Sequence, residues 1–79
     1  MPDVRLLQMP RYFFHLRGTS PYQDDGGVEL PDDAAAWREA KRFARDIEHS
    51  LQPGDDWHLE VYREGRPIYS LEIRARTIG

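Results

Sequence analysis

The sequence predicts an α+β domain in which one helix packs on one face of a four-stranded antiparallel sheet. Four segments alternate apolar and polar residues with a period of two, which is typical of strands with one buried face. A fifth segment repeats apolar residues at steps of three and four, as an amphipathic helix does. The segments follow as strand, strand, helix, strand, strand. A right-handed crossover from the second strand to the third leaves room for the first between them, so the expected strand order is 2-1-3-4.

The first two expected strands lie before the helix. Residues 11–17 are rich in aromatic side chains and contain no glycine or proline. Their alternation places Tyr12 and Phe14 on the side of the sheet that faces the helix. Residues 18–27 are rich in turn-forming residues and predict a connecting loop. Residues 28–30 alternate again between a glycine and a proline, which predicts a short edge strand that pairs with the first.

The expected helix has clear start and stop signals. The Asp32 carboxylate can accept hydrogen bonds from the free backbone N–H groups of the first turn, and Asp33 stands where the helix dipole favours negative charge. Apolar residues recur from Ala36 to Leu51 and form one stripe. Pro53-Gly54 then ends the helix.

Two further alternating segments, residues 57–63 and 68–74, follow the helix. Residues 64–67, Glu-Gly-Arg-Pro, predict a short hairpin connection between them. In the last strand we expect Tyr69 to face the helix and Ile68 to face away from it. The side chains expected in the core are Tyr12, Phe14, Leu16, Val28, Leu30, Ala36, Ala40, Phe43, Ala44, Ile47, Leu51, Trp57, Leu59, Val61, Tyr69, Leu71 and Ile73.

Length and composition indicate one domain after a short extension. Pro2 and Pro10 bracket a first stretch from which no turn leads back, so residues 1–8 are an expected N-terminal extension and residues 9–79 a single domain. The chain has no cysteine, which excludes disulfides, thiolate metal sites and cysteine nucleophiles. It has no apolar run of bilayer length and no signal-peptide core, so we expect a cytoplasmic protein without membrane contacts.

Two motifs resemble a known protein family. Residues 9–17, Met-Pro-Arg-Tyr-Phe-Phe-His-Leu-Arg, resemble the opening of the domain of unknown function 6894 family, a group of short, mostly alphaproteobacterial proteins. The resemblance continues through Asp24-x-x-Gly27-Val-Glu-Leu-Pro-Asp32, the alanine-rich helix and the strand around residues 57–61, and it covers residues 9–74. It implies that Met9 is the usual start. It implies no activity, because the family has no assigned function.

Histidines and carboxylates offer candidate metal ligands, but their pattern does not define a site. His15 and His58 are expected on the same sheet face in neighbouring strands, where Glu60 can join them. His49 is expected on the solvent side of the helix, so it does not complete a set of ligands. We therefore expect two surface histidines and no metal.

Other catalytic and cofactor patterns are also absent. The acidic pairs Asp24-Asp25 and Asp55-Asp56 lie in glycine-containing loops, but the spaced ligands and closing glutamate of a calcium loop are missing, so turn formation is their expected role. No Ser-His-Asp arrangement can be argued, and Gly26-Gly27 precedes a strand rather than a phosphate-binding helix. We expect no catalytic residue, no cofactor and no enzymatic activity.

The sheet face that the helix leaves open is the candidate binding surface. Large apolar side chains beside arginines favour contacts with another protein, and Phe13 and Tyr62 are the expected anchors. A second copy of the chain is the simplest partner, because a domain this small is marginally stable alone. A face exposed only to water is the alternative. The candidate partner-binding residues are Arg11, Phe13, His15, Arg17, His58, Tyr62, Ile68 and Arg74.

The same face supports a second hypothesis, the binding of single-stranded nucleic acid. Aromatic side chains flanked by arginines can stack on bases, and arginine outnumbers lysine ten to one in this chain. However, Glu29, Glu60 and Glu72 interrupt the patch, and the net charge is −3, which opposes binding to phosphates. We therefore expect a protein partner rather than nucleic acid.

Overall fold

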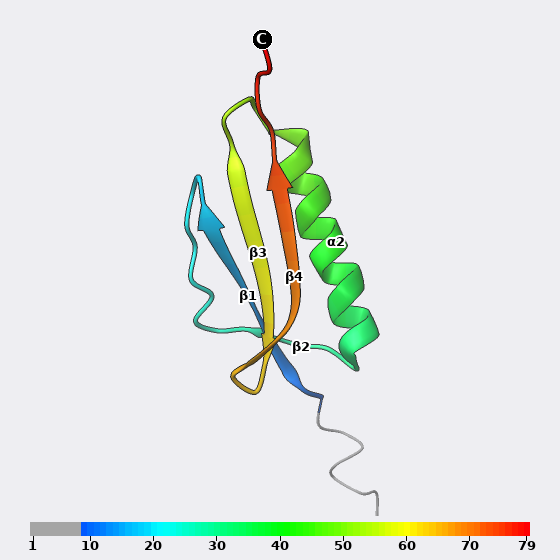
Figure 1. The fold of residues 1–79 in the computed structure, drawn as a ribbon. Coiled ribbons are helices and arrows are strands. Elements are labelled where there is room, and N and C mark those ends of the chain that lie inside the picture. The colour runs from blue at the N-terminus through cyan, green and yellow to red at the C-terminus, as the bar shows by residue number, and fades with distance from the viewer. Residues whose placement is uncertain (1–8) are drawn as a thin grey trace, which may run out of the picture.

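The computed structural model describes residues 9–79; the expected extension, residues 1–8, lies outside the described residues. Its elements are β1 (Arg11–Gly18), β2 (Val28–Glu29), α2 (Asp33–His49), β3 (Asp56–Arg63) and β4 (Arg66–Arg74). Neighbouring strands are antiparallel in the order β2-β1-β3-β4, and α2 packs on one face of the sheet (Figure 1). The predicted fold class and strand order are confirmed.

The core lies between α2 and the two central strands. Tyr12 and Phe14 of β1 are buried beside Leu59 and Val61 of β3, with Phe14 directly opposite Val61 in the register. The helix contributes mainly alanines to this core, and these short side chains let α2 approach the sheet closely. The buried helix residues are Ala35, Ala36, Ala40, Ala44 and Ile47.

Two predicted core residues are exposed in the structure. Phe43 is 36% exposed and covers the edge of Phe14, with 5.2 Å between ring centroids. It lies beside the alanine stripe rather than within it, so its ring packs from the margin of the helix. Val28 is 40% exposed because β2 is a two-residue edge strand. Both predictions of burial are wrong.

Asp33 fixes the start of α2 to three strands. Its Oδ1 accepts hydrogen bonds from Tyr12 Oη at 2.8 Å and from Arg63 Nη1 at 2.6 Å, and its backbone oxygen accepts from Tyr69 Oη at 3.0 Å. Burial raises the pKa of the Tyr12 phenol, and the bond to Asp33 raises it further, while Arg63 partly offsets both. Asp32 caps the helix as predicted, by accepting a bond from the Ala35 N–H at 2.8 Å.

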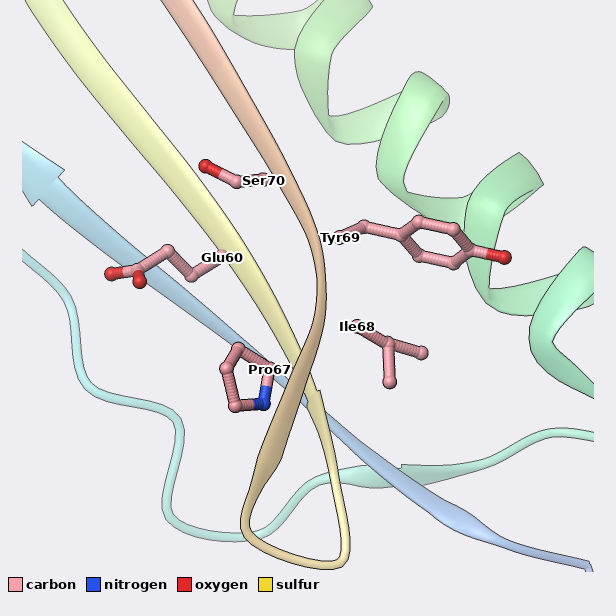
Figure 2. Close-up of a pocket in the computed structure, with 5 residues that line it drawn as sticks. All are labelled: Glu60, Pro67, Ile68, Tyr69 and Ser70. Atoms are coloured by element: carbon pink, nitrogen blue, oxygen red, sulfur yellow. The ribbon is translucent and has the colours of Figure 1, made fainter.

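A β-bulge near the start of β4 turns Ile68 toward the helix. The register pairs Val61 with Tyr69 but Tyr62 with Pro67, so β4 has an extra residue at this point. Ile68 and Tyr69 therefore point to the helix side, whereas Pro67 points to the other side (Figure 2). The prediction that Ile68 faces away from the helix is wrong, because strict alternation fails at a bulge.

Candidate functional site

The open sheet face carries an aromatic cluster made of Phe13, His15 and Tyr62. Phe13 and Tyr62 are register partners, one residue out of phase with the buried Tyr12, and so they face away from α2 as the alternation predicts. The rings of Phe13 and His15 are stacked, with centroids 6.4 Å apart, and His15 meets Tyr62 edge to face at 5.2 Å. All three side chains are partly buried, so the sheet holds them in place.

Asp24 fastens the loop between β1 and β2 to this cluster. Its Oδ2 accepts from the Phe14 N–H at 3.1 Å, and its Oδ1 accepts from the Gly26 and Gly27 N–H groups at 3.2 and 3.0 Å. Burial alone would raise the pKa of Asp24, but the three N–H groups and the nearby His15 outweigh it and hold that pKa below its ordinary value of 3.8. Turn formation, the predicted role of Asp24, agrees with these bonds.

The loop also determines which nitrogen of His15 carries a proton. The Asp24 N–H donates to His15 Nδ1 at 3.1 Å, which requires that nitrogen to be unprotonated and places the ring proton on Nε2. At Gly27 the backbone φ is +70°, and an added Cβ would lie 2.9 Å from the Phe13 ring and from the Tyr12 carbonyl oxygen. Only glycine therefore lets the loop approach Phe13 this closely.

Every arginine predicted for this face already contacts a carboxylate of the same chain. Arg11 also donates through Nη1 to the Gly26 carbonyl oxygen at 2.8 Å, so it braces the loop. These contacts offset the positive charge that the sequence placed on the face. The ion pairs are Arg11–Glu29 at 2.7 Å, Arg17–Glu60 at 2.7 Å and Arg74–Asp56 at 3.4 Å.

The two histidines of the sheet have separate surroundings. His15 lies opposite Glu60, whereas His58 lies opposite Arg17, and His58 reaches carboxylates on its own side of the face. The Nε2 atom of His58 is 3.3 Å from Asp56 Oδ1, and its Nδ1 atom is 3.6 Å from Glu72 Oε1 on β4. Among residues 9–79, no group of three or more histidines and carboxylates has the arrangement of a metal site.

One cleft borders the aromatic cluster, and a second lies at the edge of β4. The larger, about 360 Å³, adjoins His15 and Tyr62, and its wall includes Gln23 of the loop, which the sequence analysis missed. No periodic signal marks Gln23, because it belongs to a loop. The smaller cleft, about 220 Å³, adjoins the bulge of β4 (Figure 2). The lining residues are His15, Leu16, Arg17, Gln23, Glu60 and Tyr62 in the larger cleft, and Glu60, Pro67, Ile68, Tyr69 and Ser70 in the smaller one.

The structure thus brings together part of the predicted binding set. Phe13, His15 and Tyr62 form the cluster, and Arg17 stands at the rim of the larger cleft. The remaining members lie apart from it: Arg11 braces the loop, His58 and Arg74 contact Asp56, and Ile68 packs on the core side. The role of these residues in binding stays a prediction.

The fold and this face define a small α+β domain with one open sheet face and an aromatic cluster at its centre. Residues 11–74 match the model of the family described as Domain of unknown function (DUF6894), and the chain belongs to that family. No curated protein and no solved structure matches the chain. In the described part of the chain, no helix is long and apolar enough to cross a membrane.

Proposed function

We propose that this protein is a non-enzymatic interaction module that binds a partner protein through the open face of its sheet. The observation that supports this most directly is the cluster of Phe13, His15 and Tyr62 beside a cleft of about 360 Å³. Aromatic side chains that are already held in place lose little conformational freedom on binding, and they offer large apolar surfaces. The cleft next to them can receive a side chain of the partner.

The rim of this cleft gives the partner polar groups to contact. Arg17 is 67% exposed although it pairs with Glu60, which is only 19% exposed. The arginine can therefore turn toward a carboxylate or carbonyl of the partner while the glutamate stays in the sheet surface. A partner segment that places an apolar side chain on the rings and an acceptor near Arg17 fits this arrangement.

Charge favours a protein over nucleic acid as the partner. Binding to phosphates depends on arginines and lysines that release counterions, and the arginines of this face are already paired with carboxylates. The net charge of −3 acts in the same direction. An interface between proteins accepts such mixed charge at its rim.

Photo-crosslinking followed by a binding measurement tests the proposal. A photoreactive phenylalanine analogue at position 62 should capture a protein in the native host, whereas the same group at His49, exposed near the end of α2, should not. With the captured protein purified, Tyr62→Ala should weaken binding at least about tenfold, and His49→Ala should leave it unchanged.

Three outcomes would contradict this function. The first is equal capture from positions 62 and 49, and the second is an unchanged affinity for Tyr62→Ala. The third is salt-dependent binding of a labelled single-stranded RNA that Arg17→Gln abolishes, since that result would favour nucleic acid.

A further inference from the structure

The outer edge of β4 carries backbone groups that face away from the sheet. The Ala75 N–H donates to Asp55 O at 3.1 Å, and the Ala75 carbonyl accepts from the Gly54 N–H at 2.8 Å, so the backbone of Ala75 faces β3. Residues two apart on a strand point their backbone groups the same way. The N–H and C=O groups of Ile73 therefore also face β3. Those of Ser70, Glu72 and Arg74 point outward.

This edge differs from the opposite edge of the sheet. At the outer side of β1, the Leu16 backbone exchanges hydrogen bonds of 2.8 and 2.9 Å with Tyr22, Asp24 accepts from Phe14, and β2 pairs with the beginning of the strand. No such segment lies along β4 among residues 9–79. Pro67 and the bulge interrupt the first part of β4, which leaves residues 70–74 as a regular, unpaired edge.

We propose that a second copy of the chain pairs antiparallel with this edge about a two-fold axis at Ile73, so that one sheet continues across both copies. Glu72 of each copy then lies opposite Arg74 of the other, and each such pair exchanges both backbone hydrogen bonds. Ile73 of one copy lies opposite Ile73 of the other, with both side chains on the helix side of the sheet. It does so at a non-hydrogen-bonded position, where opposing side chains approach most closely.

The charged side chains of this edge favour the register centred on Ile73 over the registers centred on the residues before it. An axis at Glu72 would place two glutamates directly opposite each other, and like charges at such positions are destabilising. An axis at Leu71 would place Glu72 opposite Ser70, without an ion pair. Only the axis at Ile73 pairs Glu72 with Arg74 at both ends of the contact.

The side chains needed for these ion pairs are accessible in the single chain. Glu72 and Arg74 are 62% and 52% exposed, and their contacts within the chain are long, at 3.6 Å to His58 and 3.4 Å to Asp56. Among residues 9–79 the Arg74 contact uses Nε, so the two terminal nitrogens of its guanidinium can meet the carboxylate of the other copy.

The same register gives the end of the chain a surface to cover. Thr77 of one copy lies opposite Tyr69 of the other, which borders an apolar cleft of about 430 Å³ lined by Ala34, Trp37, Arg38 and Tyr69. The ring of Trp37 packs on Tyr69 there, with 5.1 Å between centroids. Thr77 lies on the same side of the sheet as Tyr69 in this register, so its side chain can cover part of this cleft.

Sedimentation velocity of the full chain over a concentration series tests the inference. The unaltered chain should sediment as a dimer at high concentration. Glu72→Arg and Arg74→Glu should each weaken dimerisation at least about tenfold, because each variant places two like-charge pairs across the axis. An equimolar mixture of these two variants should form a heterodimer, since both ion pairs reappear in it. Asp25→Arg, the same change of charge in the loop between β1 and β2, far from the β4 edge in strand order, should dimerise like the unaltered chain.

A second variant tests the backbone pairing. Glu72→Pro removes an N–H group that no bond within the sheet uses, so it should keep the circular dichroism of the folded chain and lose the dimer. A chain that is monomeric at every concentration, a mixture that stays monomeric, or a Glu72→Pro variant that still dimerises would overturn the inference. The proposed dimer does not depend on the proposed function of the open face, so Tyr62→Ala should leave the dimer intact.

Discussion

Replacement of Asp33 by alanine should destabilise the fold more than any other single change to a charged residue of α2. Asp33 is the acceptor for the buried hydroxyl of Tyr12 and for the guanidinium of Arg63, and it sits in the first turn of the helix. Alanine removes all of these interactions. Asparagine keeps an acceptor oxygen for Tyr12 and loses only the negative charge.

The expected magnitudes follow from these contacts. A buried hydroxyl left without a partner costs about 1–3 kcal/mol. The ion pair with Arg63 is partly exposed on both sides and adds only a small amount, and the negative charge at the helix start contributes about 0.5 kcal/mol. Asp33→Ala should therefore lower the free energy of unfolding by about 2–4 kcal/mol, and Asp33→Asn by about 1 kcal/mol. A domain of this size has only about 5 kcal/mol in total, so the alanine variant should retain only about 1–3 kcal/mol of stability.

Urea denaturation followed by circular dichroism measures both values. For a small domain with a slope of about 1 kcal/mol per molar urea, the midpoint of the alanine variant should fall by about 2–4 M. Asp46→Ala is the matched control, since Asp46 is an exposed acidic residue on the same helix, and it should change stability by less than about 0.5 kcal/mol. Equal midpoints for Asp33→Ala and Asp33→Asn would refute the reasoning, because the Tyr12 hydroxyl would then not depend on Asp33.

Two further predictions concern the loop beside the aromatic cluster. Because the folded-state pKa of Asp24 is lowered, its contribution to stability is present above the unfolded pKa of about 3.9 and is lost as pH falls through the folded value. The difference in unfolding free energy between the unaltered chain and Asp24→Asn should therefore shrink below about pH 4; a difference that stays constant in acid would contradict this. Gly27→Ala should cost about 1–3 kcal/mol, from its positive φ and from the contact with Phe13. Gly26→Ala, which meets nothing within 4 Å, is the control in thermal unfolding.

Local patterns predicted the architecture because each strand and the helix bury one face, and that burial imposes a period on the sequence. The period of two does not predict the side of the sheet on which a residue lies where that side depends on pairing with a neighbouring strand. Ile68 is turned inward by an extra residue relative to β3, and nothing within its own strand signals the change. Phe43 lies at a helical step that a wide apolar stripe would bury, but the stripe of alanines is narrow and leaves it at the margin.

The candidate site was predictable in its position but not in its electrostatics. Alternation alone placed Phe13 and Tyr62 on one face, since both lie out of phase with the buried residues of their strands. The pairing of Arg17 with Glu60 depends on the register between β1 and β3, which spacing along the chain does not define. The reach of the Asp24 carboxylate to the amide of Phe14 likewise needs the path of the loop in space.

The pairing of arginines with carboxylates on the open face has a kinetic consequence. Opposite charges only a few ångströms apart cancel at a distance, so this face produces little field beyond the Debye length of about 8 Å at physiological ionic strength. A molecule approaching it is not steered, and its association rate constant should lie near 10⁵–10⁶ M⁻¹ s⁻¹ and change little with added salt. Selectivity at such a face comes from how long a correctly oriented encounter lasts, and therefore from the dissociation rate.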